Sequence, residues 1–222
     1  MQQKPFVFTF TNLNTYDDTC AWQFFRVYIK RDIPYVATPE MDWGNKVHDA
    51  FERRLGGNVP LPADMRQWEP FAAPFDGYKP KVEAKLGITR EGRPTGFFDN
   101  DVFGRVKVDA AVIQGPVAAM ADWKTGNSKY EKPFELEIGA MFLKAHNPNI
   151  TVVRGRYIWL KNNRAGQEYD LSNFNSTWAR VNNIVERIQD DMASGEWEKK
   201  KSPLCGWCRV FDCENNTNPK RD

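Results

Sequence analysis

The sequence predicts a mixed α/β fold in which a central mixed sheet is flanked by helices. Helical periodicity of apolar residues marks both ends of the 222-residue chain, and strand-like runs lie between them. Four cysteines, one near the start and three near the end, would join the two ends around one metal centre. No repeat or low-complexity linker interrupts this pattern. We therefore expect a single domain over residues 1–213, followed by a polar tail at 214–222 without order.

The elements follow from periodicity and from turn residues. Residues 11–31 favour a helix from about Asn12, and residues 43–55 favour a second helix that Pro60 and Pro62 end. Strands are expected at 81–88, 102–113 and 117–123, with a turn at Gly115–Pro116. The pattern closes with a helix at 133–146, a strand at 152–161 and a helix at 176–192.

Composition and charge exclude several classes of protein. The formal net charge is only +2, so any affinity for nucleic acid must come from a local patch. No run of about 18 apolar residues predicts a membrane span, and the first residues lack the layout of a secretory signal. We therefore expect a cytoplasmic protein with reduced thiols, in which the cysteines bind a metal or cluster rather than form disulfides.

The cysteine spacing indicates a ligand set. Cys205, Cys208 and Cys213 form a C-x-x-C-x4-C cluster, and Cys20 supplies a fourth thiolate from the other end of the chain. Four thiolates complete the coordination of one soft metal centre. A four-cysteine zinc site remains an alternative on these residues alone.

Two acids and a lysine in the middle of the chain suggest a second metal site. Asp109 and Asp122 lie near the ends of two strands that the Gly115–Pro116 turn would pair. Close carboxylates repel each other and need a cation, and oxygen ligands suit Mg²⁺ or Mn²⁺. Lys124 lies two residues after Asp122 and shares its face on a strand. The alternative is that both acids are unrelated surface residues.

These pieces together resemble the PD-(D/E)XK nucleases of the RecB type, in particular the iron–sulfur branch that includes AddB, the CRISPR-adaptation nuclease and small phage exonucleases. The matching segments are TNLNTYDDTCAWQFFRVYI, GNKVHDAFE, VDAAVI, DWKTG and LCGWCRVFDC, which cover residues 11–213 in the family's order. The resemblance implies a single restriction-endonuclease-like domain and a metal-dependent deoxyribonuclease of bacterial or phage DNA processing.

The resemblance also assigns roles to single residues. It implies that Cys20, Cys205, Cys208 and Cys213 hold a structural four-iron–four-sulfur (4Fe–4S) cluster. It implies that Mg²⁺ or Mn²⁺ is held by His48, Asp109, Asp122 and the backbone carbonyl of Trp123, with Lys124 as a further catalytic residue. Without the resemblance, His48 would be read as a structural residue of its helix.

The sequence departs from the family at two places. The helix after the lysine carries Glu137 and Met141 where relatives have a Gln–Tyr pair that positions the lysine and the DNA. Four residues lie between Gly104 and Asp109, where the family's G-x-x-D pattern has two. Glu83 lies where relatives have an additional acid near the site, although a surface glutamate at the strand edge is the alternative.

The expected partner is DNA, with single-stranded or frayed ends favoured. Arg26, Lys30 and Arg31 lie close to Tyr28 and other aromatic residues of the first helix, and basic residues beside aromatic ones suit single strands. An amphipathic helix with a solvated basic side is the alternative. A non-catalytic DNA-binding accessory protein with the same fold remains a rival function, and the sequence identifies no protein partner.

Overall fold

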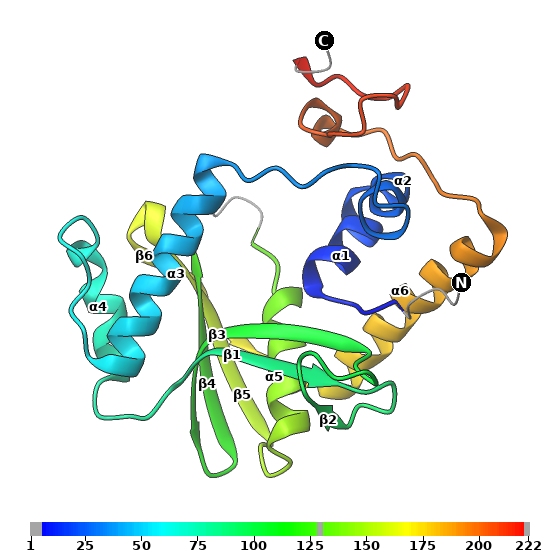
Figure 1. The fold of residues 1–222 in the computed structure, drawn as a ribbon. Helices are drawn as coiled ribbons and strands as arrows, with labels where there is room; N and C mark the ends of the chain where they lie inside the picture. The colour runs from blue at the N-terminus through cyan, green and yellow to red at the C-terminus, as the bar shows by residue number, and fades with distance from the viewer. Residues whose placement is uncertain (1–5, 128–130, 220–222) are drawn as a thin grey trace. The chain divides into compact units, whose positions relative to one another are not determined.

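The computed structural model describes residues 6–127 and 131–219, and it confirms the mixed α/β architecture (Figure 1). The chain divides into two compact units. The first contains Met1–Val7 and Ala37–Trp178, and the second contains Phe8–Val36 and Ala179–Asp222. The first unit therefore holds the whole sheet, and the second combines segments from both ends of the chain and holds all four cysteines.

The sheet of the first unit has seven strands among the described residues, in the order β2-β1-β3-β4-β5-β6, with β7 paired to β5. The parallel pairing of β4 with β5 makes the sheet mixed, because its other pairs are antiparallel. The strands are β1 (Lys81–Ile88), β2 (Pro94–Thr95), β3 (Gly104–Gln114), β4 (Val117–Lys124), β5 (Val152–Trp159), β6 (Arg164–Ala165) and β7 (Tyr169–Asp170).

Helices cover the sheet of the first unit on both faces (Figure 1). On one face, α3 (Pro39–Gly57) and α4 (Glu69–Ala72) pack with Trp123 of β4 in a buried apolar core. On the other face lies α5 (Phe134–His146), where a side chain at Gly139 would clash with Met120 of β4. Short 3₁₀ helices at Arg66–Trp68, Ala73–Phe75 and Leu160–Asn162 complete the unit.

Helix α3 begins four residues before the predicted position. Thr38 caps it by accepting a hydrogen bond from the Met41 amide (3.3 Å), and Pro39 occupies the first turn, where a missing amide hydrogen costs nothing. The helix ends at Asn58, whose left-handed backbone (φ 53°) terminates it. The added turn does not change the face that carries Val47, Phe51 and Leu55, all of which are buried as expected.

The second unit differs most from the prediction. The expected first helix is interrupted at Cys20, which has an extended backbone (φ −169°, ψ 122°). Helical and π-helical turns alternate around it: α1 (Phe10–Asn14), a π-helix at Thr15–Thr19, α2 (Ala21–Phe24) and a π-helix at Phe25–Ile29. The long helix α6 (Phe174–Ser194) begins in the first unit and continues in the second, and a 3₁₀ helix covers Pro203–Gly206.

Aromatic packing and hydrogen bonds order the second unit, including its terminal segment. Phe25 stacks on Trp197 at 5.0 Å between ring centroids. Asn216 is buried and donates hydrogen bonds to the carbonyl groups of Cys208 and Val210 (both 3.0 Å). These bonds, with one from Asn218 to the Cys208 carbonyl, fold part of the predicted polar tail back onto the cysteine segment. Residues 220–222 of the tail lie outside the described residues.

Within the described residues, every helix is too short or too polar to span a bilayer.

Candidate functional site

Three neighbouring strands carry an acidic residue at the same level of the sheet. The register of the flanking pairs puts Glu83 of β1 opposite Asp109 of β3, and it puts Asp122 of β4 opposite Asp109 on the other side. All three side chains are largely buried, with 9%, 6% and 14% of their surface exposed. The sheet therefore gathers three carboxylates in a row, where mutual repulsion favours a cation.

A local distortion of the sheet accompanies this row. Glu83 has a left-handed backbone (φ 47°) in the middle of a strand, which is strained for a residue with a side chain. Val82 packs with the core on the α3 face, whereas Val108, the partner of Ala84, lies on the α5 face near Gly139. Residues two apart on a regular strand share a face, so the two strands change face at the level of Glu83. Strain of this kind clusters at functional sites.

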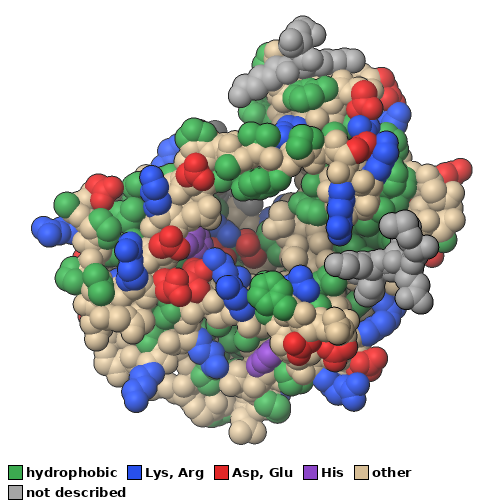
Figure 2. Space-filling model, viewed as in Figure 1, with side chains coloured by type: hydrophobic (Ala, Val, Ile, Leu, Met, Phe, Trp, Pro, Cys, Tyr) green, Lys and Arg blue, Asp and Glu red, His purple; other side chains and the backbone are tan. Residues whose placement is uncertain are grey.

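His48 of α3 joins the first two carboxylates. Its Nδ1 lies 3.1 Å from Oε1 of Glu83 and 3.3 Å from Oδ1 of Asp109. One ligand atom from each of these three residues lies within 4.8 Å of the others. Figure 2 shows histidine, acidic and basic side chains together on this face, over α3 and the neighbouring strands. An imidazole and two carboxylates are a donor set that could hold a divalent metal ion.

The charge of His48 compensates the charges of the two carboxylates beside it. Burial lowers the pKa of His48, but hydrogen bonds with Asp109 and Glu83 outweigh it and raise the pKa to about 10. Burial raises the pKa of Glu83, whereas His48 and Lys107 lower it, with a net decrease. The imidazolium therefore supplies positive charge between the two carboxylates, where a bound cation would replace it.

Asp109 is oriented from both sides. Its Oδ1 faces His48, and its Oδ2 accepts a hydrogen bond from the backbone amide of Trp123 (2.9 Å). The ring of Trp123 stacks on Phe51 of α3, with centroids 4.2 Å apart. Packing between β4 and α3 thus fixes the position of the Asp109 carboxylate relative to His48.

Lys124 lies between two carboxylates. Its Nζ is 2.8 Å from Oδ1 of Asp122 and 2.7 Å from Oε2 of Glu135 on α5, and it lies 5.4 Å from the ring centroid of Tyr157. Burial lowers the pKa of Lys124, but the two carboxylates raise it well above its usual value. Burial raises the pKa of Asp122 more than the ammonium lowers it, and Asp109 and Glu135 raise it further. Lys124 therefore remains protonated at neutral pH.

Glu135 and Tyr157 were not predicted from the sequence. Glu135 lies in the first turn of α5, two residues before Glu137, and it is Glu135 that contacts Lys124. Glu137 is half-buried, and Met141 is buried. The sequence does place Glu135 in the first turn of the helix after the Lys124 strand, where the helix dipole favours acidic residues. Tyr157 follows from the parallel register, which pairs it with Asp122.

The four cysteines line one small pocket in the second unit. Cys20 comes from the interruption of the first helix, Cys205 from the 3₁₀ helix, and Cys208 and Cys213 from the turns after it. All four are free thiols. Burial raises the pKa of the Cys208 thiol, and the neighbouring sulfurs of Cys20, Cys205 and Cys213 raise it further. The predicted convergence of the four sulfurs is therefore present as a pocket.

The basic and aromatic residues predicted to contact DNA also lie in the second unit. Arg26 is buried and paired with Asp32 and Asp212 (2.8 Å each), so its charge is already compensated. Lys30 pairs with Asp32 at 2.7 Å and is half-exposed. Arg31 is exposed, and its Nε donates to the carbonyl of Tyr28 (3.2 Å).

Of three comparisons with known proteins, the one with solved structures gave matches. No protein-family model matches the chain, and no match was found among curated proteins. A solved structure described as a "Putative exonuclease" from Eubacterium rectale matches with a TM-score of 0.52 and 12% identity, covering 90% of this chain and 85% of that protein. The structure of SSO0001 matches with a TM-score of 0.54 and 14% identity, covering 97% and 88%. At these identities the likeness establishes a shared fold.

Proposed function

We propose that the chain is a metal-dependent deoxyribonuclease of the PD-(D/E)XK type that hydrolyses phosphodiester bonds at the ends of single-stranded DNA. The observation that carries the proposal is the approach of His48, Glu83 and Asp109 to within 4.8 Å of one another, beside the Asp122–Lys124 pair. The likeness to a fold described as that of an exonuclease supports it. In this proposal residues 1–213 work as one nuclease domain.

The donor set fits Mg²⁺ or Mn²⁺, since it combines carboxylate oxygens with one imidazole. His48, Glu83 and Asp109 would hold the ion, and Asp122 and the carbonyl of Trp123 would complete the site. A bound divalent ion acidifies water and offsets the charge of a phosphodiester. The carboxylates hold their positions without it, because Asp109 is fixed by the Trp123 amide and Glu83 by His48 and Lys107.

Lys124 contributes positive charge and hydrogen-bond donors. Because Asp122 and Glu135 keep it protonated, Lys124 cannot accept a proton from water. Its ammonium can instead orient a water molecule and offset the charge that develops on the phosphate in the transition state. Asp122 and Glu135 hold the ammonium from two directions, which limits the positions it can take.

The cysteine pocket would hold a structural 4Fe–4S cluster. The convergence of one remote cysteine and a C-x-x-C-x4-C segment on one pocket supports this proposal, with a four-cysteine zinc site as the alternative. An absorbance spectrum distinguishes the two, since zinc sites are colourless.

The proposal is tested by digesting end-labelled single-stranded, duplex and closed circular DNA with Mn²⁺ or Mg²⁺. We expect wild-type protein to shorten the linear single strand first, and Lys124→Ala to leave all substrates intact. Chelation with EDTA should stop the reaction. Activity that survives both EDTA and Lys124→Ala would refute the metal-dependent mechanism. DNA binding without cleavage would favour the non-catalytic accessory protein.

A further inference from the structure

Phe98 is a large apolar side chain that the first unit holds out into solvent. It is 74% exposed and lies in the loop between β2 and β3. The loop is well defined, because the Asp99 carboxylate accepts hydrogen bonds from the Gly96 amide (2.8 Å) and the Thr95 hydroxyl (3.1 Å). Among the described residues, only Trp207 is a more exposed large apolar side chain (77%).

The loop crosses directly over β1. A Cβ atom on Gly87 would lie only 2.6 Å from the carbonyl oxygen of Gly96, so the close crossing requires glycine at position 87. Behind the loop, Arg105 of β3 lies 5.5 Å from the ring centroids of both Phe97 and Phe98. The crossing thus fixes two aromatic rings against a guanidinium group.

Basic side chains lie on β1 and β3, the strands next to the loop that carries Phe98. The register pairs Gly87 with Arg105 and Lys85 with Lys107, so the basic side chains share one face of the β1–β3 ladder. Within residues 6–127 and 131–219, neither Arg105 nor Lys85 forms an ion pair. Figure 2 shows hydrophobic and basic side chains next to one another on the surface over β1 and β3. This combination of a ring and unpaired cations suits a ligand with bases and phosphates.

The same face leads to the candidate metal site. Lys107 forms an ion pair with Glu83, which in turn contacts His48. Arg105 is four residues from Asp109 on β3, a distance of about 13 Å along the strand. That distance corresponds to at most about four stacked nucleotides of a DNA strand. A strand that reaches the metal site can therefore also reach Phe98.

We propose that Phe98, backed by Arg105, is a base-stacking platform for single-stranded DNA, and that Lys85 contacts a phosphate of the same strand. The inference rests on the proposed nuclease function, because it assigns the path by which a DNA strand would approach the carboxylates. One face of the Phe98 ring is occupied by Arg105, and the exposed remainder is open to a base. Stacking accepts any base, so the platform confers no sequence preference.

The experiment measures the binding of a fluorescein-labelled oligothymidylate by anisotropy, in EDTA so that no cleavage occurs. We expect Phe98→Ala to weaken binding at least about tenfold, and Phe98→Trp to bind as wild type does, because a larger ring also stacks. Tyr78→Ala is the matched control, since Tyr78 is also an exposed aromatic residue (47%) but precedes the opposite end of β1. Lys85→Ala should reduce the salt dependence of binding by about one ion.

A dissociation constant for Phe98→Ala within twofold of wild type would overturn the inference, and so would an equal loss in Phe98→Trp. Unchanged oligonucleotide binding would instead point to a protein partner at Phe98. The proposed nuclease function fails separately. If wild-type protein binds the oligonucleotide through Phe98 but never cleaves DNA with Mn²⁺, the platform stands and the nuclease function falls. If Lys124-dependent cleavage occurs and Phe98→Ala has no effect on binding, the nuclease function stands and the platform falls.

Discussion

The two candidate metal sites of this chain are built in opposite ways. The carboxylates of the first unit come from adjacent strands, whose hydrogen-bonded register sets their spacing before any ion binds. The cysteines of the second unit come from a helix interruption and from short turns, which are not spaced by the register of a sheet. A site on strands can lose its ion and keep its shape, whereas a site on turns depends on the group that it binds.

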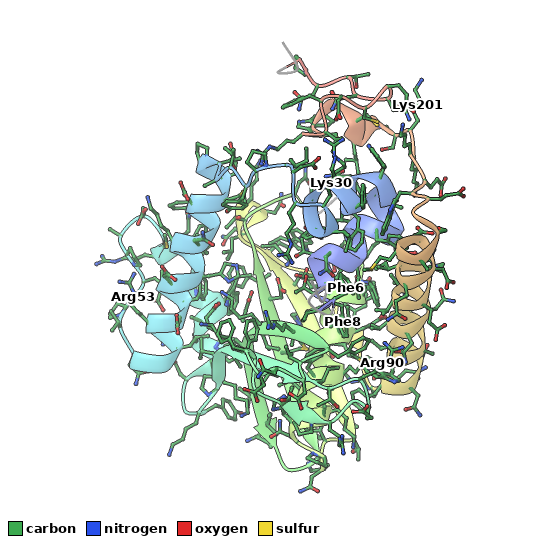
Figure 3. The ribbon with its side chains drawn as sticks, turned by 45° about the vertical axis from the view of Figure 1, so that its right-hand side comes forward. Phe6, Phe8, Lys30, Arg53, Arg90 and Lys201 are labelled. Atoms are coloured by element: carbon green, nitrogen blue, oxygen red, sulfur yellow. The ribbon has the colours of Figure 1, made fainter. Side chains whose placement is uncertain are left out.

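The largest expected effect is the loss of DNA cleavage when the carboxylate site of the first unit is changed. The cysteine site of the second unit should remain intact. Lys124→Ala should lower the rate of DNA cleavage by about 10³-fold or more, because it removes the positive charge beside the carboxylates. Arg53→Ala is a suitable control, since Arg53 points from α3 away from the sheet (Figure 3). Visible absorbance and iron content should be the same in both variants. A loss of iron in Lys124→Ala would show that the two sites are not independent.

Removing a cysteine should instead change the iron content and the stability of the second unit. With the proposed cluster in place, Cys213→Ser should lose the iron and the visible absorbance, and it should destabilise the second unit by several kcal/mol, because metal-binding energy is folding energy on such a segment. The exposed Lys201, labelled in Figure 3, offers a control in the same segment as Lys201→Ala. Iron analysis and thermal unfolding measure the effect. Full iron content in Cys213→Ser would exclude that residue as a ligand.

A smaller effect is expected at His48. Its pKa of about 10 means that the imidazole carries a proton at neutral pH in the absence of an ion, and a metal must displace that proton. The apparent affinity for Mn²⁺ should therefore rise as the pH rises, by up to about tenfold per unit between pH 7 and 9. His48→Gln should bind Mn²⁺ less tightly and with a weaker pH dependence. Parallel pH profiles for the two proteins would return His48 to a structural role.

The smallest effect concerns acid stability of the second unit. Arg26, followed by Lys30, lowers the pKa of Asp32 to about 2, and Arg26 also lowers the pKa of Asp212. Since these carboxylates bind protons more readily in the unfolded chain, their contribution is complete above about pH 4 and is lost as the pH falls toward 2. Tryptophan fluorescence should detect the transition, and Arg26→Gln should shift it to higher pH. An unchanged midpoint in the variant would contradict a stabilising role for Arg26.

The sequence predicted the sheet better than the cysteine-bearing segments, and the reason is physical. Strand β1 falls at residues 81–88 as predicted, because apolar runs bounded by turn residues determine a strand locally. The interruption at Cys20 could not be predicted in the same way. Residues 11–31 have helical periodicity throughout, and the extended backbone at Cys20 depends on tertiary contacts such as the Trp22 amide with the Glu198 carbonyl (2.9 Å).

The candidate site likewise contains residues that the sequence indicated and residues that it did not. Asp109, Asp122 and Lys124 were found because a hairpin brings neighbouring strands together. Glu83 remained ambiguous, because its participation depends on the register of β1 against β3 and on a strained backbone that no sequence pattern indicates. Glu135 was missed in favour of Glu137, because the direction of a side chain at the start of a helix follows from packing against the strand.

The left-handed backbone of Glu83 has a consequence for how this protein tolerates mutation. Asparagine and glycine adopt that conformation more easily than glutamate does, so Glu83→Asn should relieve strain in the backbone. The same change removes a carboxylate that pairs with His48 and Lys107, and the loss of these contacts opposes the gain. At position 83 the fold therefore keeps a strained backbone together with charged contacts that glycine or asparagine could not supply.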